Sequence, residues 1–95
     1  MTKFNNMLVA ACSVCNCSPK QALSRDRQQK CVFARFIFFA LATEDNYRDY
    51  HAAWFLGRHR ATAYHYRRQI NALCEFDKHF NNLLAKAKDK YAKLC

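Results

Sequence analysis

The sequence predicts an all-α fold, a small helical bundle that contains a helix-turn-helix, and three observations support this prediction. Apolar residues recur at intervals of three and four along most of the chain, which is the spacing of an amphipathic helix. No stretch alternates apolar and polar residues in the way that a half-buried strand does. Short polar breaks, a single proline and a single glycine separate the apolar segments. The length of 95 residues and the apolar share of 52% suit one folded domain over residues 1–95.

The first part of the chain is expected to form a helix over about 3–15 and a short turn after it. Ser18 is placed to cap this turn, and Pro19 suits the first helical position, where the missing amide hydrogen has no partner to lose. The turn should end at Leu23. The apolar positions of the first helix are Phe4, Leu8, Ala11, Cys12 and Cys15.

The next helix is predicted to begin with Ser24 as its cap and to run to about Thr43, with Asp26 offsetting the macrodipole in its first turn. Its segment 31–42 is apolar except for Arg35, so other helices must cover it on several sides. This segment is too short to span a membrane, which needs about 20 residues. We therefore expect a core helix, no membrane partner, and a basic start that projects from a buried rod.

A helical hairpin is predicted after the polar break at 44–46. Its first helix covers residues 47–56, Gly57 provides a left-handed helix end, and its second helix covers about 60–75. The second helix has an inward set of Ala63, Tyr66, Ile70 and Leu73 or Cys74, and an outward set of Arg60, Ala61, Tyr64, His65 and Arg68. A basic helix after a tight glycine turn is typical of a helix-turn-helix that reads the major groove, although an ordinary hairpin has the same pattern.

The last helix is expected to begin after Asp77, whose side chain can cap it. Its apolar residues form one stripe, which is the spacing of a packing helix rather than of a binding site. These residues are Phe80, Leu83, Leu84, Ala87, Tyr91 and Leu94.

The chain is strongly basic, and its basic residues are clustered. Sixteen Lys and Arg against seven Asp and Glu give a formal net charge of +9, which suits nucleic acid or another polyanionic surface. Residues 20–35 carry five basic residues against one acidic residue, and residues 46–70 do the same. The lysines of the last segment are better explained as a solvated face; they are Lys86, Lys88, Lys90 and Lys93.

Three of the six cysteines, Cys12, Cys15 and Cys17, form a C-x-x-C-x-C pattern. A zinc ion would need a fourth ligand, such as Cys31 or a histidine, and no second C-x-x-C or H-x-x-x-H is present. Small buried thiols are the more common outcome of such spacing. We therefore expect no metal and no cofactor, and reduced cysteines would fit a cytoplasmic protein.

No catalytic constellation stands out, and the chain is not expected to be an enzyme. Pairing His65 with Cys74, or His59 with Cys17, would give a base and a nucleophile, but no local signature supports either pair.

One stretch resembles a known DNA-binding motif. The segment GRHRATAYH at 57–65, followed by Ile70, lies without a gap over a family pattern of glycine, arginine, aspartate, histidine, Ser/Thr, Thr and Val with a later histidine. The basic start and apolar helix at 24–42 and the short segment 7–14 lie in the matching order upstream. In these features the chain resembles the C-terminal origin-binding domain of the bacterial replication initiator DnaA.

The resemblance implies roles for individual residues. Arg27 matches the arginine that enters the minor groove beside the recognised box, and Arg35 matches an arginine of the long helix that grips phosphate. Arg58 and Thr62 match phosphate or base contacts at the start of the recognition helix.

The chain departs from the family where bases are read. His59, Arg60 and Ala61 stand in place of the family's Asp-His-Ser/Thr. An aspartate accepts a hydrogen bond from cytosine, whereas an arginine donates to guanine, so we hypothesise a site with a guanine that the family's box lacks. No G-x-x-x-x-G-K-[ST] is present, so ATPase activity is not expected.

The leading expectation is a sequence-specific binder of double-stranded DNA, of bacterial or phage type and associated with the nucleoid, that acts in replication initiation or its control. The alternatives are a small transcriptional regulator or a helical module that docks on a replication or transcription protein, which an exposed apolar patch at Tyr47, Trp54 and Phe55 would favour. RNA binding is a weaker third possibility. The expected DNA-binding residues are Arg25, Arg27, Lys30, Arg35, Arg58, His59, Arg60, Ala61, Thr62, His65 and Arg68.

Overall fold

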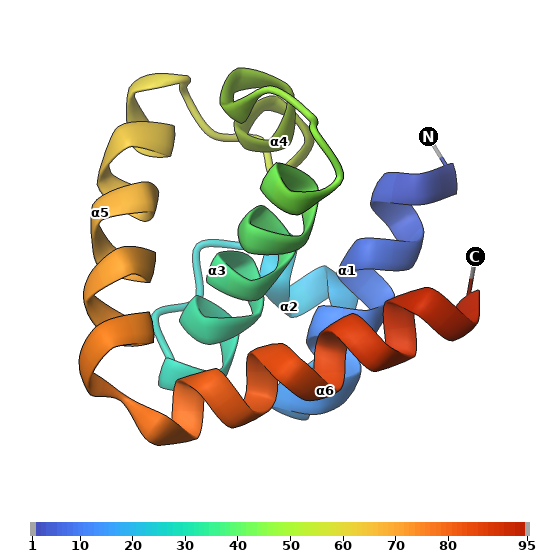
Figure 1. Ribbon diagram of the computed structural model, residues 1–95. Coiled ribbons are helices and arrows are strands. Elements are labelled where there is room, and N and C mark those ends of the chain that lie inside the picture. Colours follow the sequence, from blue (N-terminus) through green and yellow to red (C-terminus); the bar gives the residue numbers. More distant parts are fainter. Residues whose placement is uncertain (1, 95) are drawn as a thin grey trace.

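Helix α3 (Gln29–Glu44) runs through the middle of the molecule, and the other helices pack around it (Figure 1). The computed structural model describes residues 2–94, and in that range the chain forms helices and no strand. The all-α prediction is therefore confirmed. The other helices are α1 (Thr2–Cys15), α2 (Pro19–Leu23), α4 (Asp49–Phe55), α5 (Ala61–Phe76) and α6 (Lys78–Leu94).

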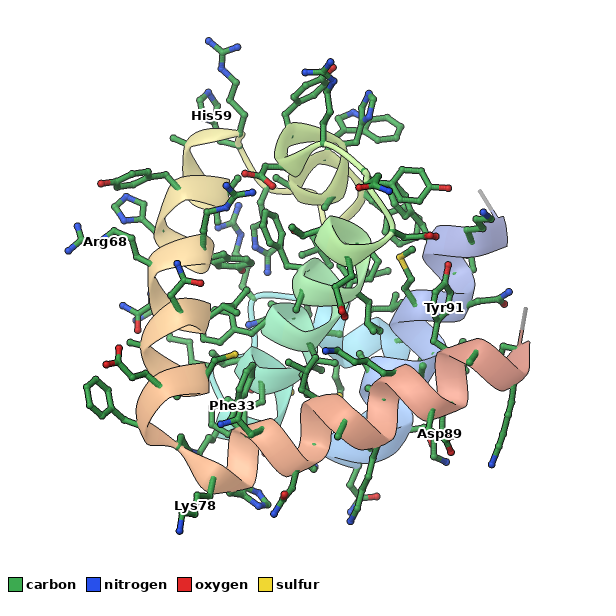
Figure 2. All side chains as sticks on the ribbon, in the orientation of Figure 1. Phe33, His59, Arg68, Lys78, Asp89 and Tyr91 are labelled. Atoms are coloured by element: carbon green, nitrogen blue, oxygen red, sulfur yellow. The ribbon has the colours of Figure 1, made fainter. Side chains whose placement is uncertain are left out.

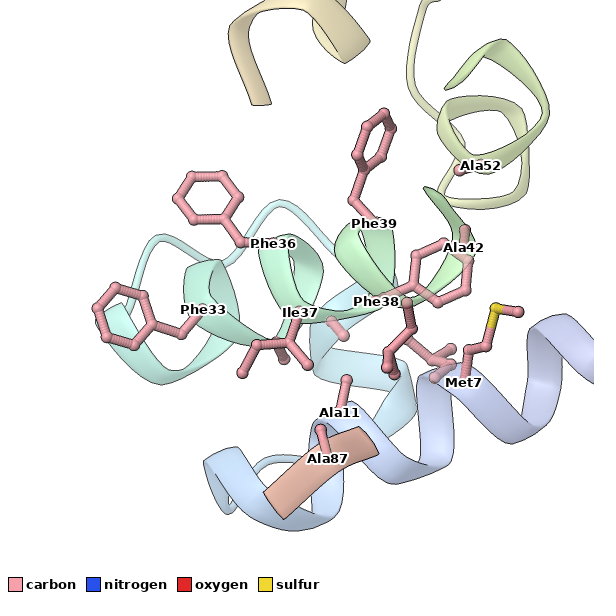
Figure 3. Packing of buried hydrophobic residues seen from close by; sticks show 14 of the residues in the cluster. Met7, Ala11, Phe33, Phe36, Ile37, Phe38, Phe39, Ala42, Ala52 and Ala87 are labelled. Carbon is pink, nitrogen blue, oxygen red and sulfur yellow. The ribbon is translucent and has the colours of Figure 1, made fainter. Parts of the chain in front are cut away.

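The side chains of α3 are buried on all of its sides, as its apolar composition predicts. Phe38 lies on the side of α3 that faces Met7 of α1 (Figure 3). Phe36 and Phe39 point from the other side of the helix. Loss of any of these rings would cost about 3–5 kcal/mol, because a cavity would remain in a tightly packed interior. Ring pairs across helices include Phe38 with Phe4 (5.7 Å), Phe33 with Phe80 (5.2 Å) and Phe36 with Tyr66 (5.1 Å), measured between centroids.

The expected start of the long helix is wrong. Ser24 ends α2 instead of capping α3, because its hydroxyl donates to the carbonyl of Gln21 at 2.6 Å. Asp26 lies outside the helix, where its carboxylate accepts the backbone N–H of Gln28 at 2.9 Å. Gln28 then precedes the first turn of α3, with no side-chain cap. Residues 24–28 therefore form a loop. Of the basic residues expected on a rigid rod, Arg25 and Arg27 lie on that loop, whereas Lys30 lies in the first turn of α3.

Two other expected caps are present. The Ser18 hydroxyl accepts the N–H of Gln21 at 3.1 Å, and the Gln21 side chain accepts the N–H of Ser18 at 3.0 Å, which satisfies two otherwise unpaired donors. Pro19 occupies the first position of α2. Asp77 caps α6 by accepting the N–H of Phe80 at 3.0 Å.

The hairpin differs from the prediction mainly at its first helix. Tyr47 lies before α4, and its ring packs on Phe4 at 4.7 Å, so it belongs to the connection from α3. Gly57 has φ +72° and follows α4, as expected for a left-handed helix end. Helix α5 begins at Ala61 with Arg60 just before it.

In the C-x-x-C-x-C segment, Cys12 and Cys15 are buried thiols, as expected, whereas Cys17 is half-buried. Cys31 is also buried, and Cys74 is exposed. Burial raises the pKa of the Cys15 thiol to about 12, because the low-polarity surroundings disfavour the thiolate. Between residues 2 and 94, no group of three or more His, Cys, Asp and Glu side chains is arranged to hold a metal ion. In the same range, no helix has the length and apolar character needed to cross a membrane.

Candidate nucleic-acid interface

Helix α5 turns one face to the core and the other to solvent. Ala63 and Ile70 are buried against the rest of the molecule. Tyr64 is 63% exposed and Arg68 is exposed, and Figure 2 shows Arg68 pointing outward from α5. The Arg68 guanidinium carbon lies 5.8 Å from the centre of the Tyr64 ring, close enough for a cation–π contact. The expected orientation of this helix is therefore confirmed.

Near the C-terminal end of α5, only one of the two residues expected to face the core does so. Tyr66 is half-buried, and its ring packs edge-on to Phe36 and Phe39 of α3 at 5.1 and 5.8 Å. Leu73 is half-buried against the core, but Cys74 is exposed, so the inward position offered to either residue belongs to Leu73. The outer face of α5 is not sealed beneath other helices, and this leaves it open to a large partner.

Arg58 ties the loop at 24–28 to the α4–α5 turn. Its Nη2 donates to the carbonyl of Ser24 at 2.6 Å, across 34 positions of sequence, and its Nη1 donates to the carbonyl of Leu56 at 2.9 Å. Arg25 and Arg27 are exposed on this loop. Two basic segments that are distant in sequence are thus held next to each other at the start of α5.

The expected phosphate contact of Arg35 is wrong. This side chain is only 5% exposed, and its Nε donates to the carbonyl of Ala22 at 2.7 Å. Its Nη2 donates to the carbonyls of Ser24 at 2.8 Å and Asp26 at 2.7 Å. Carbonyl oxygens that turn inward need donors, and the buried guanidinium supplies them. Arg35 therefore shapes the loop that carries the surface arginines and does not reach a phosphate itself.

Lys30 is also placed apart from the others. It is exposed in the first turn of α3 and lines a small pocket with His79 and Leu83 of α6. The remaining expected residues lie on the loop, the turn or α5. The bond from Arg58 to Ser24 brings these three segments together, and they carry Arg25, Arg27, Arg58, His59, Arg60, Ala61, Thr62, His65 and Arg68.

The start of α5 has an unusual cap. The His59 Nδ1 accepts the backbone N–H of Ala61 at 3.1 Å, which satisfies one of the unpaired donors at this helix end. With Nδ1 accepting, the ring hydrogen resides on Nε2, where it is able to donate outward. Figure 2 shows His59 at the outer end of the helix. Arg60 contributes no side-chain cap and is exposed.

The gathered arginines are not neutralised by carboxylates of the chain. The ion pairs among the described residues use Lys3, Arg67, Lys88 and Lys93 as their cations. Asp49, the acidic residue of the hairpin, is held by Arg67 at 2.7 Å. Arg25, Arg27, Arg60 and Arg68 form no ion pair within this part of the chain, so their charge is available to an external anion.

The exposed apolar patch that would favour a protein-interaction module is present only at Trp54. Trp54 is 71% exposed, but Tyr47 and Phe55 are half-buried with their rings against Phe4. Tyr50, which is 47% exposed, takes their place beside Trp54. Tyr50 and Trp54 are four residues apart, which places them on the same face of a helix. Because alanines occupy the inward face of this helix, the sequence could have indicated that both rings are exposed.

The fold and this surface define the chain as a small all-α protein with an exposed basic helix. Comparison with protein-family models, with characterised proteins and with solved structures found no match to the chain. The assignment of function therefore depends on the residues and their geometry.

Proposed function

We propose that this protein binds double-stranded DNA in a sequence-specific manner through the outer face of α5 and the loop at 24–28. The observation that carries the proposal is the bond from Arg58 to the Ser24 carbonyl, which holds two basic segments next to one exposed helix. An α-helix fits the major groove, which is about 12 Å wide, and flanking cations can grip the phosphates on either side. By its resemblance to the DnaA domain, we propose a role in replication initiation or its control, at the nucleoid and without ATPase activity.

The proposal assigns base contacts to some residues of this surface and phosphate contacts to others. Arg60, Ala61 and His65 would meet base edges, where an arginine reads guanine and an alanine methyl packs on thymine. Arg27 would enter the adjacent minor groove. The residues proposed for phosphate contact are Arg25, Thr62 and Arg68, with Arg58 adding charge while it holds the loop.

A salt titration tests the electrostatic part of the proposal. The affinity for a mixed-sequence duplex, measured by fluorescence anisotropy, should fall linearly on a log–log plot as salt rises. Removing one phosphate contact with Arg68→Gln should reduce the slope by about 0.9. The matched control is Lys86→Gln on α6, which removes the same charge outside the proposed surface. Undetectable binding at low salt, or equal slopes for the two variants, would refute the proposal.

A further inference from the structure

A shallow pocket lies beside the proposed DNA surface, between α4 and the turn that leads to α5. It has a volume of about 660 Å³. Trp54 and Tyr50 expose 71% and 47% of their surface, and the Tyr50 ring lies 4.4 Å from the His51 ring, centre to centre. The lining residues are Tyr50, His51, Trp54, Arg58, His59 and Arg60.

The two walls of this pocket have complementary chemistry. The α4 wall is made of aromatic rings, and the opposite wall, from the turn, presents Arg58, His59 and Arg60. No Asp or Glu lines the pocket. A partner that combines a flat apolar group with a negative charge would therefore match both sets of lining residues.

One nucleotide of a single strand meets both requirements in one unit. Its base can stack on an exposed ring, and its phosphate lies one sugar away, where a guanidinium can hold it. Bases within a duplex cannot use such a platform, because their faces are already stacked on their neighbours. An acidic peptide also matches the charge. Its apolar and acidic groups belong to different residues, however, so no single residue of the peptide can contact both the rings and the guanidinium groups.

We propose that this pocket binds single-stranded DNA, with a base stacked on Trp54 and the adjoining phosphates at Arg58 and Arg60. This activity goes beyond duplex binding, since it uses α4, which the duplex surface does not. The two surfaces share the turn at 58–60, so a strand that leaves a bound duplex can continue into the pocket. The protein would then bind a duplex with a single-stranded extension more tightly than a blunt duplex.

Tryptophan fluorescence reports on the pocket directly, because Trp54 is the only tryptophan of the chain. Titrating the full-length protein with single-stranded oligothymidine at low salt should quench this fluorescence in a saturable manner. In anisotropy with labelled oligothymidine, Trp54→Ala should weaken binding by at least about fivefold, the low end of the effect of removing one stacking ring. Because Trp54 is mostly exposed, circular dichroism should show an unchanged fold.

The matched control is Phe76→Ala, which removes another exposed ring, 80% exposed, at the far end of α5. Its affinity for oligothymidine should equal that of the wild type. Absence of quenching, or equal losses for the two variants, would overturn the inference. Tighter binding of a Glu-rich, Phe-containing peptide would assign the pocket to a protein partner instead, and tighter binding of oligouridine would assign it to RNA.

The duplex measurement separates this inference from the proposed function. Trp54→Ala should leave the affinity for a blunt duplex unchanged while it weakens oligothymidine binding. If the wild type bound oligothymidine but no duplex, the proposed function would fail and the inference would stand. If the wild type bound duplex but its fluorescence was not quenched by oligothymidine, the inference would fail and the proposed function would stand.

Discussion

Arg35→Met tests whether the buried arginine has a structural role or contacts DNA. Methionine keeps most of the apolar stem but removes the donors to the carbonyls of Ala22, Ser24 and Asp26, at 2.7, 2.8 and 2.7 Å. A hydrogen bond from a charged group contributes about 1.5–3 kcal/mol. Water can replace the guanidinium at the loop carbonyls, but the bond to Ala22 is fully buried. Relief from burying a charge offsets part of the loss.

We therefore expect Arg35→Met to lower the free energy of unfolding by about 2–4 kcal/mol. In a domain of this size each kcal/mol shifts Tm by roughly 4–8 °C, so Tm should fall by about 8–32 °C. Thermal unfolding followed by circular dichroism measures this shift. Arg25→Met is the matched control, because Arg25 is exposed on the same loop and its loss should change stability by no more than about 0.5 kcal/mol.

The opposite pattern would refute this reasoning. If Arg35→Met melted like the wild type and only its duplex affinity fell, Arg35 would be a surface phosphate contact. The residue would then act as the resemblance to the DnaA domain implies, and the loop geometry described above would be wrong.

Three further predictions concern base reading, the turn and the thiols. Arg60→Ala should cost about 1–3 kcal/mol on a duplex obtained by binding-site selection and almost nothing on random duplex, and equal losses would contradict its assigned role. Gly57→Ala should lower the free energy of unfolding by about 1–2 kcal/mol in urea titrations, because φ is +72° while no atom lies within 4 Å of an added Cβ; a much larger loss would indicate a steric clash. Because burial raises the pKa of Cys15 from 9.0 to about 12, the stability that its protonated thiol contributes is complete below about pH 9 and is lost as pH rises toward 12. The stability difference between the wild type and Cys15→Ala should therefore fall between pH 8 and pH 11, and a constant difference would contradict the assignment.

The sequence predicted the helices well because their signals are local and strong. Apolar residues on every side of α3, the proline at the start of α2 and the glycine after α4 each leave few alternatives. It failed at Ser24, because a serine can end one helix as well as begin the next, and only the tertiary contacts of the loop decide. Those contacts come from Arg35 and Arg58, both distant in sequence.

The surface was predicted in part. The outward face of α5 follows from helical spacing, but the convergence of the loop with the turn depends on a contact that no local pattern encodes. The role of Arg35 did have a signal, since a lone charge in a segment that must be covered on all sides has to find its partners inside. The sequence did not indicate the pocket beside Trp54, because two of the three aromatic residues considered for an apolar patch, Tyr47 and Phe55, pack on Phe4.

The measurement that tests the duplex-binding proposal most directly is an NMR titration of the isotope-labelled protein with duplex DNA. We expect the amide shifts to change at 24–28 and 58–68, in fast or intermediate exchange at low salt, with little change along α6. No change, or changes concentrated on α1 and α6, would show that DNA does not bind where the arginines converge.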